Sequence, residues 1–343
     1  MATIKDIAKK TNLSITTVSR VLSYDPSLSV THETKQKVFE TAEKLNYTKH
    51  IRKKQRRDEA ITNIAIIQWL DAKEEIDDIY YMSIRIGVEK RAAELGLNLL
   101  KMTTIKNGLP NNIEGILAIG KFDQQSVDEL TKLNKNVVFI GNNHPLNGFD
   151  TINGDFSQAT EIALTHLIEK GHKRIGFIGA EDKKHLHGYR KYKSPAIYTF
   201  IDYLKSKNLF DESLFFFTNT SEPNTQVGYR LMNEALTTLS DNLPTAFFAV
   251  NDEIALGCLN ALREHKLRVP DDVSIISIND LSISQFLTPA LTTVKVYTEE
   301  MGELGINTLK ERMESEGNPI AKRITLSTKL IERDTVKDII SEA

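Results

Sequence analysis

The sequence predicts a small helical domain followed by a large α/β region, a fold of the α + α/β class, and three observations support this prediction. Residues 3–22 have the pattern of two short amphipathic helices joined by a polar turn. From residue 61 onward, apolar runs of strand length alternate with helical patterns. Residues 1–59 carry 13 Lys and Arg against 7 Asp and Glu, whereas the remaining residues carry 31 against 39. The basic start predicts a surface that binds a polyanion.

The first two helices have recognisable start and stop signals. Thr3 followed three residues later by Asp6 resembles a capping box and predicts the start of the first helix. Asn12 ends that helix, and Ser14 is suited to cap a second helix over residues 15–22. A tight polar turn between two short helices predicts a helix-turn-helix.

The second helix has an apolar face and a polar face. Its inward spacing is occupied by Val18, Val21 and Leu22. The residues left facing outward are Ile15, Thr16, Thr17, Ser19 and Arg20. Such side chains are often simply solvated, but in a helix-turn-helix this row is the one that enters the major groove of DNA.

A third helix and a basic segment complete the N-terminal region. Thr31 can cap a helix over residues 32–46, which predicts a three-helix DNA-binding domain over residues 1–47. Residues 48–59 hold six Lys and Arg between Lys49 and Arg57. This run fits a solvated linker as well as a hinge that attracts phosphates and makes the affinity for DNA depend on salt.

The remainder, residues 60–333, is predicted to form two similar α/β subdomains with a cleft between them, because its length exceeds one comfortable core. Predicted strands cover residues 64–69, 98–102, 113–119, 137–140, 173–178, 214–217, 246–250 and 274–278. Predicted helices cover residues 81–95, 125–133, 158–170, 196–207, 227–239 and 254–265. Parallel sheets with helices on both faces follow from this alternation.

Polar or aromatic residues just past strand ends are the candidates for binding a small molecule, since a cleft collects them there. Tyr80 follows the first strand, and Asn251 and Asp252 follow the strand over residues 246–250. Asn279 follows the strand over residues 274–278, and Asp155 is a weaker candidate. For Asn251 and Asp252 the alternative is capping of the next helix.

Composition excludes several classes of protein. No apolar run reaches the ~18 residues of a membrane span, and no secretory signal opens the sequence. We therefore expect a cytoplasmic protein. The single cysteine, Cys258, lies among apolar residues, which favours a buried side chain. No Cys/His cluster has metal spacing, and we expect neither a metal nor another cofactor.

Catalytic signals are missing as well. The sequence lacks the G-x-S-x-G, G-x-x-x-x-G-K-[ST] and H-E-x-x-H patterns. The adjacent carboxylates Asp271 and Asp272 stand where a helix or strand begins, and His185 and His187 lie in a basic loop without a nearby carboxylate. We therefore predict that the protein is not an enzyme.

The string D-I-A-x-x-x-x-L-S-x-x-T-V-S-R-V-L over residues 6–22 resembles the start of the lactose-repressor (LacI/GalR) family of bacterial transcription regulators. The resemblance implies that Ile15, Thr16 and Arg20 read base edges. It implies that Ser14, Thr17 and Ser19 contact phosphates, which position the protein without specifying sequence. We add Thr3, Lys53 and Lys54 to the predicted DNA-binding set.

Later strings extend the resemblance to the family's sensor, which has a periplasmic-binding-protein-like fold. They are H-L-I-E-K-G-H-K-R-I-G-F-I-G (166–179), A-F-F-A-V-N-D-E-I-A-L-G (246–257), V-P-D-D-V-S-I-I-S-I-N-D (269–280) and P-A-L-T-T-V (289–294). The resemblance implies crossings between subdomains near Asp155, Leu291 and Arg323. One subdomain would then contain residues 60–155 and 292–322, and the other residues 156–291 and 323–333.

The function implied is that of a repressor of a carbohydrate-utilisation operon. Such a protein binds double-stranded operator DNA as a homodimer and responds to a small-molecule effector in the cleft. The string I-D-D-I-Y-Y-M-S-I-R-I-G-V-E over residues 76–89 is most similar to repressors of galactoside-utilisation operons, so a sugar or sugar phosphate is the expected effector. No membrane partner is expected.

Three positions depart from the family pattern. The family's hinge inserts a leucine between base pairs, but this chain has Lys54, or Arg56 in a longer register, at that position. Asn279 stands where the family usually carries an effector-binding aspartate. Ala196 stands where it commonly carries an arginine, for which Arg190, Lys191 or Lys193 are possible substitutes.

Two rival functions remain to be compared. A free sugar-binding receptor predicts an export signal and no helix-turn-helix, and residues 1–22 disagree with both expectations. An enzyme on a doubly wound fold would need a nucleotide-binding loop or a catalytic constellation, which the sequence does not show.

Overall fold

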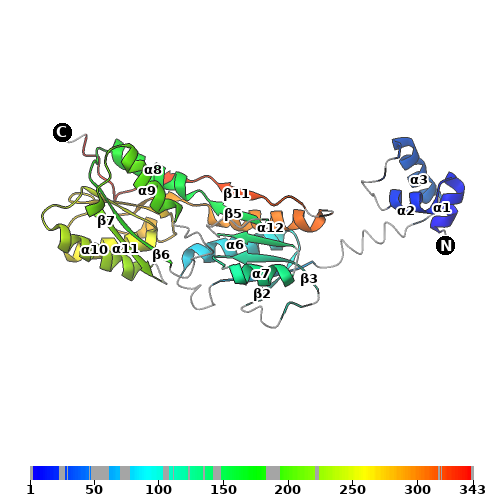
Figure 1. Ribbon diagram of the computed structural model, residues 1–343, viewed down its shortest axis with the longest axis horizontal. Coiled ribbons are helices and arrows are strands. Elements are labelled where there is room, and N and C mark those ends of the chain that lie inside the picture. The colour runs from blue at the N-terminus through cyan, green and yellow to red at the C-terminus, as the bar shows by residue number, and fades with distance from the viewer. Residues whose placement is uncertain are drawn as a thin grey trace. The chain divides into compact units, whose positions relative to one another are not determined.

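A computed structural model gives the structure of this 343-residue chain. It describes residues 3–22, 28, 30–45, 47, 62–69, 78–102, 108–110, 112–122, 124–133, 136–141, 148–182, 194–220, 224–315, 317 and 319–340. The chain divides into two compact units, Met1–Thr62 and Asn63–Ala343. The predicted fold class, a helix-turn-helix domain followed by an α/β region of two sheets, is confirmed (Figure 1).

The described part of the first unit consists of α1 (Ile4–Thr11), α2 (Ile15–Leu22) and α3 (His32–Lys44). α1 ends at Asn12, whose φ of 57° is a left-handed conformation that asparagine tolerates. Ser14 caps α2, because the Thr17 N–H donates to its Oγ at 2.9 Å. Thr31 caps α3 in the same way, accepting from the Thr34 N–H at 3.2 Å.

The three helices enclose one small hydrophobic core. Its buried side chains are Ile7, Ala8, Val18, Val21, Leu22, Val38, Ala42 and Tyr47. All three inward residues predicted for α2 belong to this core. A core of this size is typical of domains that are only modestly stable on their own.

The second unit contains two six-stranded sheets. The first has the order β11-β5-β4-β3-β1-β2, and every neighbouring pair is parallel. Its strands are β1 (Asn63–Gln68), β2 (Asn98–Met102), β3 (Ile113–Ile119), β4 (Val137–Ile140), β5 (Asp150–Gly154) and β11 (Arg323–Leu326).

The second sheet has the order β12-β10-β9-β8-β6-β7, and its neighbours are parallel except for the antiparallel pair β10 and β12. Its strands are β6 (Ile175–Asp182), β7 (Phe215–Thr220), β8 (Ala246–Ala249), β9 (Ser274–Asn279), β10 (Thr292–Lys295) and β12 (Lys329–Ile331).

Helices cover both faces of each sheet, so successive strand residues are buried on opposite sides. On the first sheet, Ile64 and Ile66 pack with α6 (Ile79–Glu94) and α12 (Thr298–Glu314), while Ala65 and Ile67 pack with α7 (Gln124–Leu133). On the second sheet, Phe248 packs with α8 (Phe156–Glu169) and α9 (Pro195–Ser206), while Phe247 packs with α10 (Thr225–Leu239) and α11 (Asp252–Glu264). Short 3-10 helices occur at Glu212–Leu214 (η2) and Ser284–Phe286 (η3).

α6 and α12 lie in contact through glycine. A Cβ at Gly302 would lie 2.1 Å from the Ile84 carbonyl oxygen, and one at Gly87 would lie 2.0 Å from the Glu299 carbonyl oxygen. Only glycine permits the two backbones to approach this closely.

The described chain passes between the sheets at three places: Asp155, residues 296–297 and residues 327–328. The second and third crossings lie a few residues beyond Leu291 and Arg323, where the sequence places them. Residues 292–295 form β10, which pairs with β9 of the second sheet, and residues 323–326 form β11, which pairs with β5 of the first. Both segments therefore belong to the opposite subdomain from the predicted one.

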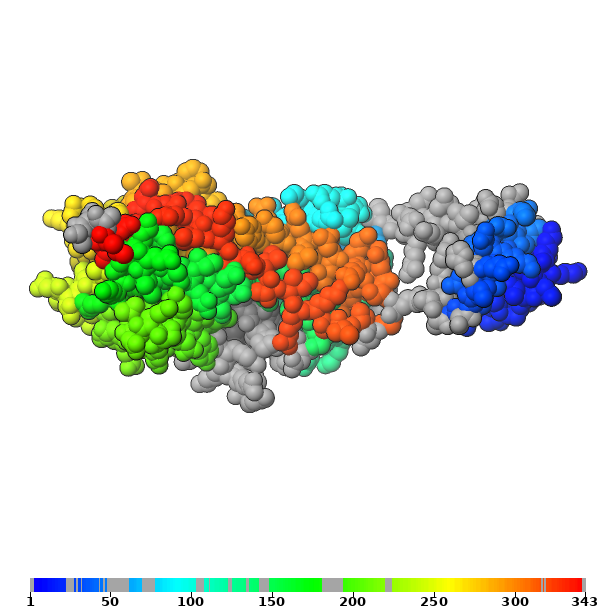
Figure 2. All heavy atoms as spheres, turned by 90° about the horizontal axis from the view of Figure 1, so that it is seen from above, coloured from blue at the N-terminus to red at the C-terminus, as the bar shows by residue number. Residues whose placement is uncertain are grey.

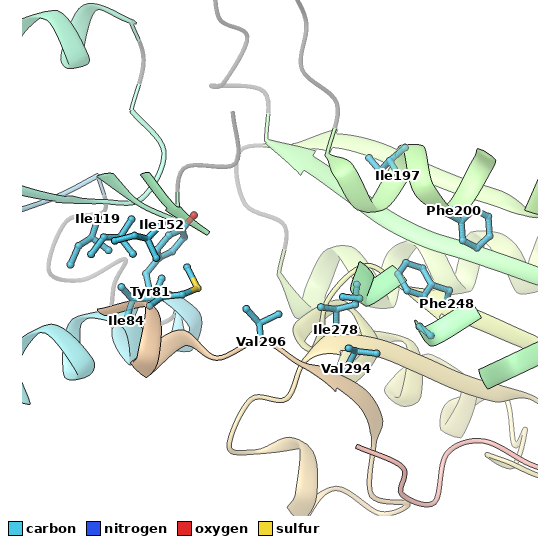
Figure 3. Close-up of a cluster of buried hydrophobic side chains, with 14 of the residues drawn as sticks. Tyr81, Ile84, Ile119, Ile152, Ile197, Phe200, Phe248, Ile278, Val294 and Val296 are labelled. Carbon is cyan, nitrogen blue, oxygen red and sulfur yellow. The ribbon is translucent and has the colours of Figure 1, made fainter. Parts of the chain in front are cut away.

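The crossings are held together by direct contacts. The Asp155 N–H donates to the Leu326 carbonyl at 2.9 Å, and a Cβ at Gly154 would lie 2.6 Å from Val296 Cγ1. Gln158 Oε1 accepts from both the N–H and the hydroxyl of Thr328, at 2.7 and 3.1 Å. Figure 3 shows Val296 between apolar side chains of the two subdomains.

The C-terminal segment after Leu326 returns to the second sheet, where β12 pairs with β10. It lies beside α8, as the adjoining red and green surfaces of Figure 2 show. The Ile339 N–H donates to the Lys170 carbonyl at 3.0 Å, and His172 bonds the Lys337 carbonyl through Nε2 at 3.1 Å.

Candidate functional site

The outward row of α2 is exposed, as predicted. Ile15 is 49% exposed although it is a large apolar residue, and Thr16 and Ser19 are exposed beside it. Thr17 and Arg20 are half-buried at the edges of the row. The surface presents an apolar group, hydroxyls and a guanidinium, which are the groups that contact thymine methyls, phosphates and base edges.

Three hydroxyls near the helix starts also hold local structure. The Ser14 and Thr17 hydroxyls lie 2.8 Å apart. The Thr3 N–H and hydroxyl both donate to Asp6 Oδ2 at 2.8 Å, and these two hydrogen bonds lower the pKa of the Asp6 carboxyl. Lys53 and Lys54 lie outside the described residues, so their predicted role stays a prediction.

Tyr80 lies in the first turn of α6, whose start Asp78 caps by accepting from the Tyr81 N–H at 3.1 Å. Its hydroxyl is buried and has no hydrogen-bond partner among the described residues. Burial, with the charge of Asp78 as the smaller cause, raises the pKa of the Tyr80 phenol well above its ordinary value. A buried polar group without a partner is costly, which indicates a place that a ligand can complete.

Asn279 has the same property at the end of β9. Its Oδ1 is buried and lacks a partner within the described part of the chain. The backbone takes positive φ values at Asn279 (129°) and at Asp280 (56°). Asp280 forms an ion pair with Arg333 at 2.6 Å.

Asn153, near the end of β5, is a residue that the sequence analysis missed. Its Oδ1 is a third buried oxygen for which the described residues provide no partner. The signal was available, because Asn153 is a polar residue near the carboxyl end of a strand, but residues 150–154 were not predicted as a strand.

Tyr80 and Asn279 approach the same crossings from opposite subdomains. The Tyr80 ring lies 6.3 Å from that of Phe156, which begins α8 just after the first crossing. The Val296 N–H donates to the Asn279 carbonyl at 3.3 Å, and Val296 lies against Gly154. A chain of contacts thus links the two residues around the carboxyl ends of both sheets.

Two other predicted effector residues cap helices. Asn251 accepts from the Ile254 N–H at 2.8 Å at the start of α11. Asp155 accepts from the Gln158 N–H at 2.9 Å at the start of α8. For Asn251 this is the alternative that the sequence analysis left open.

Asp252 requires a correction. It is 2% exposed, and burial raises the pKa of its carboxyl although hydrogen bonds oppose this shift. Its oxygens accept from the Ser277, Ser284 and Thr293 hydroxyls and the Leu281 N–H at 2.5–2.7 Å. Because the chain's own donors occupy both oxygens, Asp252 organises the second subdomain and is not available to an effector.

Other chemistry receives no support from the described residues. They contain no group of three or more His, Cys, Asp or Glu side chains placed to hold a metal ion. Cys258 is fully buried, and burial raises the pKa of its thiol far above the reactive range. None of the helices described is long and apolar enough to span a membrane.

Comparison with known proteins identifies both units. Residues 3–50 match the family "Bacterial regulatory proteins, lacI family", and residues 164–336 match "Periplasmic binding protein-like domain". The chain is 38% identical to the HTH-type transcriptional regulator GanR of Bacillus subtilis (strain 168), over 98% of this chain and 100% of that protein. The chain belongs to the lacI family.

Other members are similar over comparable lengths. The HTH-type transcriptional regulator GalR of Lacticaseibacillus casei is 36% identical over 97% of this chain and 99% of its own. Among solved structures, the complex of the transcriptional regulator CelR with cellobiose matches with a TM-score of 0.67 and 20% identity, covering 98% of this chain and 100% of that one. The lac repressor dimer bound to operator and the anti-inducer ONPF matches with a TM-score of 0.65 and 20% identity, covering 98% and 99%.

As a lacI-family member, the chain is a DNA-binding transcriptional regulator with a helix-turn-helix, not an enzyme. Ala196, the position at which the resemblance predicts an arginine, is 1% exposed within α9. A methyl group buried there makes no polar contact. Its possible substitutes Arg190, Lys191 and Lys193, like His185 and His187, lie outside the described residues.

Proposed function

We propose that this regulator represses a carbohydrate-utilisation operon in the cytoplasm, binding a two-fold symmetric operator as a homodimer and responding to a sugar. The observation that carries the proposal is the exposed row of α2, with Ile15 half exposed beside Thr16, Ser19 and Arg20. An apolar side chain exposed on a well-capped short helix is explained if a partner covers it. DNA is that partner in a helix-turn-helix.

Within this surface, Ile15, Thr16 and Arg20 read base edges, while Ser14, Thr17 and Ser19 contact phosphates and Thr3, Lys53 and Lys54 assist. The Ser14 hydroxyl already accepts from the Thr17 N–H, so it supports both the helix and the phosphate contact. A homodimer supplies two such helices about one helical turn of DNA apart, which explains a symmetric operator.

The effector is held where the two sheets' carboxyl ends meet. Tyr80 and Asn279 offer a phenol and an amide, and Asn153 adds a second amide. These are neutral groups that suit sugar hydroxyls, and the Asp280 carboxylate beside them is paired with Arg333. An uncharged sugar therefore fits the described residues better than a sugar phosphate, and Asn251 and Asp155 contribute through the helix starts that they cap.

Control of DNA binding follows from a shift between the two subdomains. A sugar that prefers one arrangement changes the separation of the two helix-turn-helix domains and so the fit to the operator half-sites. A coupling free energy of ~1–3 kcal/mol would change operator affinity by roughly 5- to 150-fold.

The test is an electrophoretic mobility shift with the DNA upstream of the operon that contains the gene, repeated with mono- and disaccharides. We expect a shifted band with a two-fold symmetric footprint that weakens as salt rises. Arg20→Ala is expected to cost ~1–3 kcal/mol at one operator position if it contacts a base there. Absence of a shifted band at low salt would contradict the proposal, and a band insensitive to every sugar would contradict its effector.

A further inference from the structure

The turn that ends β9 has an unusual backbone. Asn279 and Asp280 both have positive φ, 129° and 56°, although neither is glycine. Side chains other than glycine adopt this region at a cost in energy, so a pair of such residues persists only where neighbouring groups hold it. The same turn carries the buried Oδ1 of Asn279, which has no hydrogen-bond partner among the described residues.

Arg333, after β12, holds this turn from the C-terminal segment. Its Nη2 donates to Asp280 Oδ1 at 2.6 Å, and its Nη1 donates to the Leu291 carbonyl at 2.8 Å. The Arg333 N–H also donates to the Thr292 hydroxyl at 2.9 Å. One planar guanidinium thus connects the two ends of the loop 280–291, a geometry that lysine cannot reproduce.

The ion pair is sheltered from water. The side chains of Arg333 and Asp280 are 18% and 13% exposed, so solvent screens their attraction less than that of a surface pair. The other side of the turn is fixed by Asp252, which accepts from the Leu281 N–H at 2.7 Å. Asp280 therefore lies between a buried anchor and a guanidinium.

We propose that Arg333 is a positioning residue of the effector site: by binding Asp280 and Leu291 it keeps the 279–280 turn in the conformation that presents the Asn279 amide to a sugar. Arg333 acts through Asn279 and itself touches no effector. This inference rests on the proposed function.

The test measures sugar binding to the full chain by calorimetry. The probes are D-galactose, lactose, melibiose, cellobiose, D-ribose and galactose 1-phosphate, and the one that binds the wild type most tightly is used for the variants. These are N279A, R333M, R333K and the double variant N279A/R333M. Arg268, which pairs with Asp272 at 2.9 Å on the exposed surface before β9, supplies the matched control R268M.

We expect N279A to weaken binding about 2- to 10-fold, the value of one neutral hydrogen bond. R333M should weaken binding by no more than N279A does, and R333K by less than R333M. In the double variant the loss should equal that of N279A alone, because Arg333 has no remaining group to position. R268M should bind as the wild type does.

A general loss of stability would give a different pattern. In that case the factors for N279A and R333M would multiply in the double variant, and the inference would be overturned. The inference would also be overturned if R333M bound the probe as tightly as the wild type while N279A bound it more weakly. The proposed function would then remain intact. If no probe binds the wild-type chain, the proposed sugar response fails and this inference fails with it.

Discussion

Replacing Tyr80 by phenylalanine should stabilise the free protein and weaken its response to sugar. The Tyr80 hydroxyl is buried and lacks a partner among the described residues. A buried polar group left in this state costs about 1–3 kcal/mol. Tyr80→Phe removes the hydroxyl but keeps the ring and its contacts with Tyr81 and Phe156, so the free energy of unfolding should rise by up to that amount.

The neighbouring Tyr81 provides a matched control with the opposite sign. Its hydroxyl donates to the Gly141 carbonyl at 3.4 Å. Tyr81→Phe should therefore lower the free energy of unfolding, by about 0.5–1 kcal/mol because the bond is long. The two substitutions are at adjacent positions and make the same chemical change. Any unspecific effect of losing a phenol hydroxyl therefore cancels when the free energies of unfolding of the two variants are compared.

The assay is thermal unfolding of the full chain with and without the best-binding sugar. We expect the midpoint of Tyr80→Phe to rise by a few degrees without sugar, since 1 kcal/mol corresponds to roughly 2–4 °C for a unit of this size. Adding the sugar should raise the unfolding midpoint of Tyr80→Phe by less than it raises the midpoint of the wild type. A lower midpoint for Tyr80→Phe without sugar, or an undiminished response to sugar, would refute the reasoning.

Three further changes test other parts of the molecule. Ile15→Ala should weaken operator binding by at most about 1.5 kcal/mol, half the value of a fully buried isoleucine, because Ile15 is 49% exposed in the free protein. The loss should disappear on a duplex in which uracil, which lacks the methyl group, replaces the contacted thymine. An equal loss on every duplex would contradict a base contact. Gly302→Ala should lower the unfolding midpoint, because its Cβ would lie 2.1 Å from the Ile84 carbonyl oxygen and overpacking costs about 1–3 kcal/mol; an unchanged midpoint would show that the helices can separate freely. Burial lowers the pKa of His172 below the ordinary 6.5, so below that pH the unfolded chain binds a proton that the folded chain does not, and stability should fall as the pH drops below 6.5. His172→Gln should flatten this fall, measured by thermal unfolding across that pH range, and an equally steep fall in the variant would contradict the prediction.

The exposed face of α2 could be predicted from the sequence because the information for it is local. Ser14 and Thr31 cap the helices that follow them, and Val18 is buried where the helical period requires it. A short helix with one apolar face leaves little choice about which residues point outward. The exposure of Ile15 therefore followed from spacing alone.

The helix α12 could not be predicted in this way, because its determinants lie on another element. Gly302 is a poor helix former, and what makes glycine necessary there is the backbone of α6 at Ile84. Periodicity carries no sign of that approach. The second and third crossings lie a few residues beyond their predicted positions for the same reason, because the pairing of β10 and β11 with strands distant in sequence decides where the chain crosses.

The surroundings of the candidate effector residues could be predicted only in part. Tyr80 and Asn279 follow from their places at strand ends, and both have a buried oxygen without a described partner. Asp252 has a similar place but meets four donors from later segments of the chain. Arg333 reaches Asp280 from 53 positions away in the sequence. Position in the sequence indicates where a polar residue lies, but not which groups from distant parts of the chain form hydrogen bonds or ion pairs with its side chain.

The linked crossings between the sheets restrict how the sensor can move. Asp155 is bonded to Leu326, Gln158 to Thr328, and Val296 rests on Gly154, so the three connections form a narrow band. Since these contacts tie the connections to one another, sliding one sheet past the other would break them, whereas bending about the crossings could keep them. Bending about the crossings is therefore the motion between the two subdomains that this structure would resist least.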